Sequence, residues 1–63
     1  MTSKLAPVLN MVLSNMSGAP QDAIYTALCA TMEEFGQPVD AAWDKSFTDA
    51  ARQVSRKQSY TFR

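Results

Sequence analysis

The 63-residue chain contains no histidine and one cysteine, Cys29. Without histidine it lacks the commonest protein zinc ligand and the most frequent general base. One cysteine cannot form an internal disulfide. Neither of the two glycine positions belongs to a glycine-rich phosphate loop. We therefore expect no metal site, no cofactor, no small-molecule substrate and no enzymatic activity.

Long apolar runs are also missing. The stretch from Leu5 to Leu13 is interrupted by Pro7 and Asn10, whereas a membrane-spanning helix needs about 20 consecutive apolar residues. An export signal needs an uninterrupted apolar centre, which this stretch does not provide. We expect no membrane partner and a cytoplasmic location.

One signature, G-x-P-x-D-A, occurs twice, at residues 18–23 and at residues 36–41. Glycine supplies the left-handed residue that ends a helix, and proline fits the first position of the next helix. The aspartate then lies in the first turn, where it faces the positive end of the helix dipole. The signature therefore predicts two helix junctions.

Between these junctions, apolar residues recur every three or four positions, as on one face of a helix. The predicted fold is all-α: a three-helix bundle in up-down-up order, with helices at about 4–16, 20–35 and 38–57 within a domain of residues 1–58. A short extended C-terminal tail, residues 59–63, comes after it. The predicted core-facing residues are Leu5, Val8, Leu9, Val12, Leu13 and Met16 in the first helix, Ile24, Ala27, Leu28, Thr31 and Phe35 in the second, and Val39, Trp43, Phe47, Ala50 and Val54 in the third.

Several apolar residues lie outside these stripes. Met11 points away from the stripe of the first helix, while Tyr25, Cys29 and Met32 form a shoulder on the second. A domain of about 60 residues buries only about 60% of its unfolded surface, so a partner that covers exposed apolar area would stabilise it. We expect these four residues to contact a partner, or else the shoulder to be covered by the third helix.

Charge is unevenly distributed, although six basic and six acidic residues sum to zero. All six acids lie before residue 50, and the C-terminal end carries Arg52, Arg56, Lys57 and Arg63. This pattern also matches the dipole of the last helix. Together with Tyr60 and Phe62, the basic residues Arg56, Lys57 and Arg63 form a candidate binding arm for a protein or a nucleic acid. The alternative is a frayed terminus, or aromatic rings folded back onto the bundle.

The remaining candidates for chemistry have structural interpretations. Cys29 lies mid-helix beside Tyr25 and Met32, where a small packing residue is expected. Asp40 and Asp44 open the third helix, so capping is the better interpretation than a carboxylate pair. The corner from Glu34 to Phe47 resembles a helix-turn-helix, but these two aspartates would repel DNA phosphates.

The sequence therefore predicts a non-enzymatic protein-binding protein, such as an inhibitor, adaptor or assembly subunit. Its expected partner is a larger protein or further copies of itself. The alternative is a nucleic-acid-binding protein that uses the basic C-terminal segment.

Overall fold

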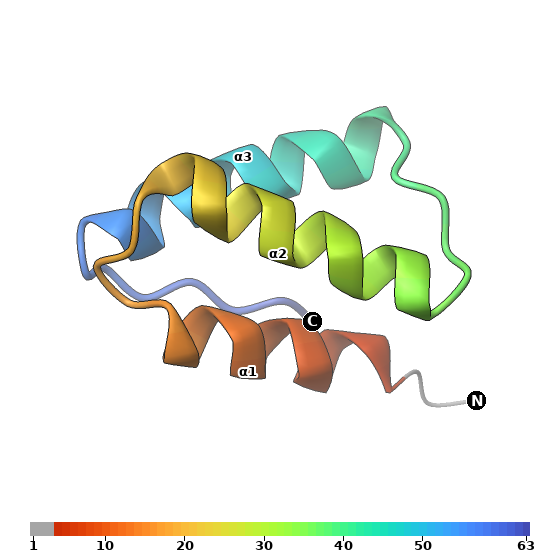
Figure 1. Cartoon of the computed structure of the whole chain (residues 1–63), viewed down its shortest axis with the longest axis horizontal. Helices are drawn as coiled ribbons and strands as arrows, with labels where there is room; N and C mark the ends of the chain where they lie inside the picture. Colours follow the sequence, from red (N-terminus) through yellow and green to blue (C-terminus); the bar gives the residue numbers. More distant parts are fainter. Residues whose placement is uncertain (1–3) are drawn as a thin grey trace.

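Three helices form where the apolar residues recur at helical spacing: α1 (Leu5–Asn15), α2 (Gln21–Glu34) and α3 (Ala41–Ser55). They are shown in Figure 1, a computed structural model that describes residues 4–63. The first three residues of the predicted domain lie outside the described residues. Successive helices run in opposite directions, so the predicted up-down-up three-helix bundle is confirmed. No helix in residues 4–63 has the length and apolar character needed to cross a membrane.

The core lies where the apolar stripes of the three helices meet. α1 contributes Leu5, Leu9 and Leu13 at intervals of four residues, as predicted. Among residues 4–63, the buried apolar core comprises Leu5, Leu9, Leu13, Ile24, Leu28, Met32, Phe47, Ala50, Ala51, Val54 and Phe62. Thr31, the one buried polar residue within residues 4–63, donates its hydroxyl to the Ala27 carbonyl at 3.0 Å. Burial of this hydroxyl therefore leaves no unsatisfied donor.

Both glycines adopt the predicted left-handed backbone, with φ of 83° at Gly18 and 67° at Gly36. Gly36 ends α2 in a Schellman motif, in which the Gln37 N–H donates to the Met32 carbonyl at 3.0 Å. The Gly18 N–H instead donates to the Val54 carbonyl at 2.9 Å. This bond ties the α1–α2 junction to the C-terminal end of α3.

The two copies of the signature start their helices in different registers. Pro20 directly precedes α2, whereas α3 begins only after Asp40, whose carboxylate accepts from the Trp43 N–H at 2.9 Å. The predicted capping role of Asp40 is confirmed. Of the two starting points that the sequence offers for the third helix, Pro38 and Asp40, the structure uses Asp40, because the aspartate cap and not the proline sets the first turn.

Two predicted core residues are exposed. Phe35 is 43% exposed because α2 ends at Glu34 and the ring lies beyond the last helical residue. Val39 is 37% exposed because it precedes the cap of α3. Both errors arise from extending a helical stripe by one or two residues beyond the actual end of the helix.

Candidate functional site

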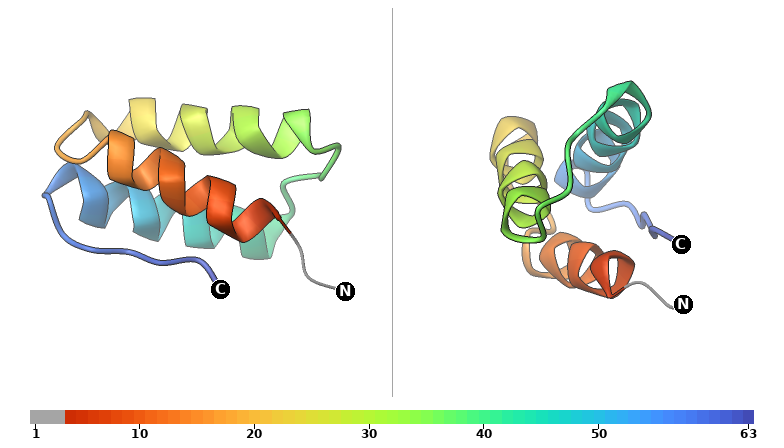
Figure 2. Two further views of the ribbon diagram at one scale, coloured as in Figure 1. Left: turned by 90° about the horizontal axis from the view of Figure 1, so that it is seen from below. Right: turned by 90° about the vertical axis from the view of Figure 1, so that its right-hand side faces the viewer.

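The C-terminal tail runs back between α1 and α3. α3 ends in a second Schellman motif, in which the Gln58 N–H donates to the Gln53 carbonyl at 2.9 Å and Lys57 takes the left-handed position with φ of 63°. The turn at Lys57 reverses the chain. The tail then lies antiparallel to α3 and beside α1, where a fourth helix of a bundle would lie (Figures 1 and 2).

The side-chain amide of Asn10 holds the tail by its backbone. Its Nδ2 donates to the Phe62 carbonyl at 3.0 Å, and its Oδ1 accepts from the Phe62 N–H at 2.7 Å. One amide thus satisfies both backbone groups of one residue, as a neighbouring β-strand would. This pairing recognises an extended backbone and requires no particular side chain at the paired residue.

The Phe62 ring provides the second anchor and is only 8% exposed. It lies edge-on to Phe47 with ring centroids 5.7 Å apart, and it contacts Trp43 at 6.3 Å and Tyr60 at 5.1 Å. Tyr25 joins the same cluster through Phe47 at 6.5 Å. The cluster therefore contains five of the six aromatic residues of the chain, and Phe62 completes it from the tail side.

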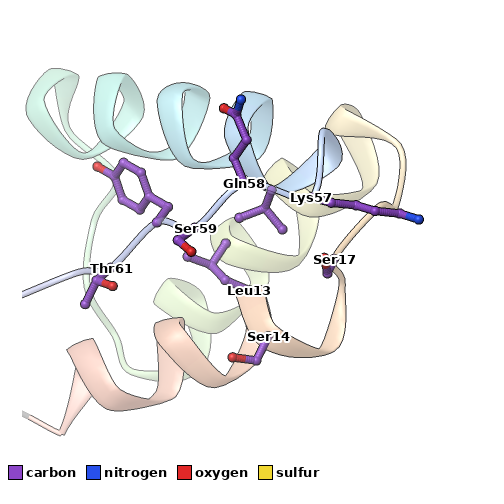
Figure 3. Close-up of a pocket in the computed structure, with 9 residues that line it drawn as sticks. Leu13, Ser14, Ser17, Lys57, Gln58, Ser59 and Thr61 are labelled. Atoms are coloured by element: carbon purple, nitrogen blue, oxygen red, sulfur yellow. The ribbon is translucent and has the colours of Figure 1, made fainter.

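We call the residues of α1 and α3 that face the tail the tail site: Asn10, Leu13, Trp43, Phe47 and Val54. A cleft of about 300 Å³ remains between the tail and the C-terminal end of α1, and small hydroxyl side chains line much of it. Figure 3 shows Leu13 and Ser59 at this cleft, while the Lys57 side chain extends away from it. The tail therefore fits closely at Phe62 and loosely near its start.

The partner-binding residues predicted from the helices do not form one surface. Met11 is 64% exposed on α1. Tyr25 and Cys29 are half-buried, and Tyr25 contacts Phe47 and Asp44 of α3, as in the alternative that the third helix covers the shoulder. Met32 is fully buried, so its expected exposure is wrong: it lies one turn after Leu28 and shares the core face.

The predicted arm residues are likewise separated. Phe62 and, in part, Tyr60 belong to the packed cluster, so the expectation of free aromatic rings is wrong and the fold-back alternative is correct. Arg56, Lys57 and Arg63 are exposed. The stem of Lys57 crosses Gly18, where an added Cβ would lie 3.1 Å from Lys57 Cε. Arg56 and Lys57 therefore lie at the end of α3, Arg63 lies at the other end of the tail (Figure 1), and the ring of Phe62 faces inward.

A polar contact joins the shoulder of α2 to α3. The Tyr25 hydroxyl donates to the Asp44 carboxylate. This hydrogen bond, with a contribution from burial, raises the pKa of Tyr25 to about 12. Asp44 therefore binds a side chain of the neighbouring helix in addition to lying in the first turn of α3.

Sequence reasoning missed Asn10 and placed Trp43 only in the general core. The available signal was an amide at position 10 beside the apolar stripe of α1, where a surface helix would usually carry a long charged side chain. Spacing alone could not connect it to Phe62, which is 52 residues away in the chain.

No protein-family model, curated protein or solved structure shows significant similarity to this chain.

Proposed function

We propose that this chain is a non-enzymatic protein-binding protein that captures an extended peptide segment at the tail site. The observation that carries the proposal is the Asn10–Phe62 pairing: one side-chain amide satisfies both backbone groups of a residue whose ring enters an aromatic pocket. This combination of backbone pairing and side-chain pocket is how proteins commonly bind extended peptides.

The contacts that the tail makes with Asn10, Trp43 and Phe47 define which peptides can bind in its place. A segment that binds here must present a free N–H and C=O at the residue opposite Asn10, which excludes proline there. The same residue must carry an aromatic side chain that fits against Trp43 and Phe47. Arg56 and Lys57 lie at the end of α3 and at the turn before the tail, so acidic residues on the N-terminal side of the aromatic residue would favour binding.

The rings of Tyr60 and Phe62 are engaged in the aromatic cluster, which leaves the basic C-terminal residues without free rings for base stacking. We therefore retain protein binding over nucleic-acid binding. The cytoplasmic location expected from the sequence remains part of the proposal.

The test is a selection of random extended peptides against the immobilised full chain, followed by titration of the selected peptides against wild type and Asn10→Ala. We expect an enriched aromatic residue with no proline at that position, and a change in fluorescence of Trp43, the one tryptophan. Binding should weaken about tenfold in Asn10→Ala, because two hydrogen bonds are lost. Asn15→Ala, at the end of the same helix, is the matched control. Peptides that bind equally to Asn10→Ala would contradict the proposal.

A further inference from the structure

The tail is a separable part of the molecule. Within residues 4–63 it belongs to no helix, and its hydrogen bonds to the body go through Asn10. Its buried ring contacts α3 at Trp43 and Phe47. All these contacts are made with residues that precede Lys57 in the chain. A tail from a second molecule could make the same contacts without any change in the tail site.

The turn that directs the tail back onto its own chain is strained. Lys57 has φ of 63°, in the left-handed region that glycine occupies at the equivalent position after α2. A side chain with a Cβ is disfavoured in this region. This strain is relieved when the tail leaves the tail site. The free energy needed to detach the tail is smaller by the same amount.

When the tail leaves, it exposes an apolar surface that favours renewed binding of a tail. Phe47 and Val54 lie beneath the tail, and Trp43 loses a ring neighbour when Phe62 leaves. A chain of this size buries little apolar surface elsewhere, so it cannot easily offset the area exposed when the tail leaves. The open form therefore requires an occupant for the tail site, and the tail of a second open copy fits it residue for residue.

We propose that two copies of this chain exchange C-terminal tails, each Phe62 entering the tail site of the other molecule and pairing with its Asn10. The proposal rests on the proposed function of the tail site and names a second copy as the partner. Reciprocal exchange closes as a two-fold dimer. The second tail then docks within an already formed complex, so its insertion is favoured by the effective concentration that the first one creates.

The test is complementation between two variants of the full chain. Asn10→Ala has an intact tail and a damaged site, whereas Phe62→Ala has an intact site and a damaged tail. Only the tail of the first can fill the site of the second. We expect ¹⁵N-labelled Phe62→Ala, mixed with unlabelled Asn10→Ala, to show shifted resonances for the Asn10 side-chain amide and the Trp43 indole N–H.

The matched control is the unlabelled double variant Asn10→Ala/Phe62→Ala, which has no intact tail and should shift neither resonance. If Phe62→Ala is unfolded alone, the mixture must restore its helical circular dichroism, since a ligand of the folded state promotes folding. At protein concentrations on the order of 1 mM, even a weak complex held by one tail forms in measurable amounts. If neither the resonance shift nor the restored circular dichroism is seen there, tail exchange is overturned. Peptide capture by Asn10 in the selection experiment would still stand in that case.

A change at the turn tests the same proposal without damage to the site. Proline cannot adopt the left-handed φ of Lys57, so Lys57→Pro prevents the tail from returning to its own chain. We expect its mass in sedimentation equilibrium to double from the 6.9 kDa of one chain, while Lys57→Gly remains a monomer. The double variant Asn10→Ala/Lys57→Pro, whose tail site is damaged in the same chain, should again be a monomer. A Lys57→Pro chain that stays monomeric overturns the proposal.

Discussion

At the scale of single residues, Asn10 and Asp44 each add a polar contact from their own helix to another part of the molecule. Asn10 connects α1 to the tail, and Asp44 connects α3 to Tyr25 on α2. The hydrogen bonds of Asn10 are partly buried and so partly shielded from water, whereas the Tyr25–Asp44 contact lies at the exposed surface. They align packed elements that apolar contacts alone would leave free to slide.

The Tyr25–Asp44 contact predicts an unusual titration. Ionisation of Tyr25 removes the donated proton and places two negative charges together, which is why its pKa rises from 10.0 to about 12. The ultraviolet absorbance of tyrosinate, measured in a Tyr60→Phe background, should report this value, because Tyr25 is then the one tyrosine. Asp44→Ala should return the pKa of Tyr25 toward 10.0. Asp49→Ala, on the same helix, should leave it near 12.

The same shift gives stability a defined pH dependence. Since the pKa of Tyr25 is higher in the folded chain than in the unfolded one, the contribution of the contact is fully present below pH 10 and is lost as the pH rises toward 12. Urea unfolding across this range should show a steeper loss of stability in the Tyr60→Phe chain than in Tyr60→Phe/Asp44→Ala. If both variants lose the same free energy of unfolding over this pH range, the Asp44 contact does not affect the ionisation of Tyr25.

At the scale of elements, helix ends decide the architecture more than helix interiors do. Gly36 and Lys57 occupy the same left-handed position of a Schellman motif, yet the first turn leads into another helix and the second into the tail. The difference lies in the residues downstream of each turn. Asp40 can cap a new helix, whereas no capping residue with an apolar stripe behind it comes after Lys57.

Substitution of the two glycines separates backbone strain from contact. Gly36→Ala should destabilise the chain by about 1 kcal/mol from its positive φ alone, because nothing lies within 4 Å of the added Cβ. Gly18→Ala should cost more, since its Cβ would meet the Lys57 stem at 3.1 Å. The excess should disappear when Gly18→Ala is made in a Lys57→Ala chain. Chemical denaturation of the four variants and the wild type measures each difference, and equal costs for the two glycines would refute the contact.

The helices could be predicted from sequence because apolar spacing and left-handed glycines are local signals. The start of α3 was left open between two residues, since Pro38 and Asp40 are both good starting residues, and the structure uses the Asp40 cap. The tail site was even harder to predict from the sequence. Asn10 and Phe62 are distant in the chain, and the alternation of small and aromatic residues in the tail is the same for a free arm and for a packed one.

At the scale of the whole molecule, three helices of this length make a bundle with one open side, and the tail closes it (Figure 2). Direct contact between α1 and α3 is limited, and Phe62 bridges them through Asn10 on one side and Phe47 on the other. The tail therefore has two roles that compete: it completes the core of its own chain, and it occupies the site that we propose for a partner.

Because the tail completes the core, loss of its one buried ring should affect the whole fold. Phe62→Ala removes a core phenylalanine, a change that costs about 3–5 kcal/mol, whereas domains of this size have a total stability of about 3–9 kcal/mol. Urea unfolding should therefore show a large loss of stability, and the emission of Trp43 should shift to longer wavelength as its ring contact is removed. Phe35→Ala is the matched control, because the same substitution at a 43% exposed ring outside the cluster should cost less than about 1 kcal/mol. Similar costs at the two positions would mean that the tail covers the bundle without stabilising it, and that α1 and α3 are held together through α2 alone.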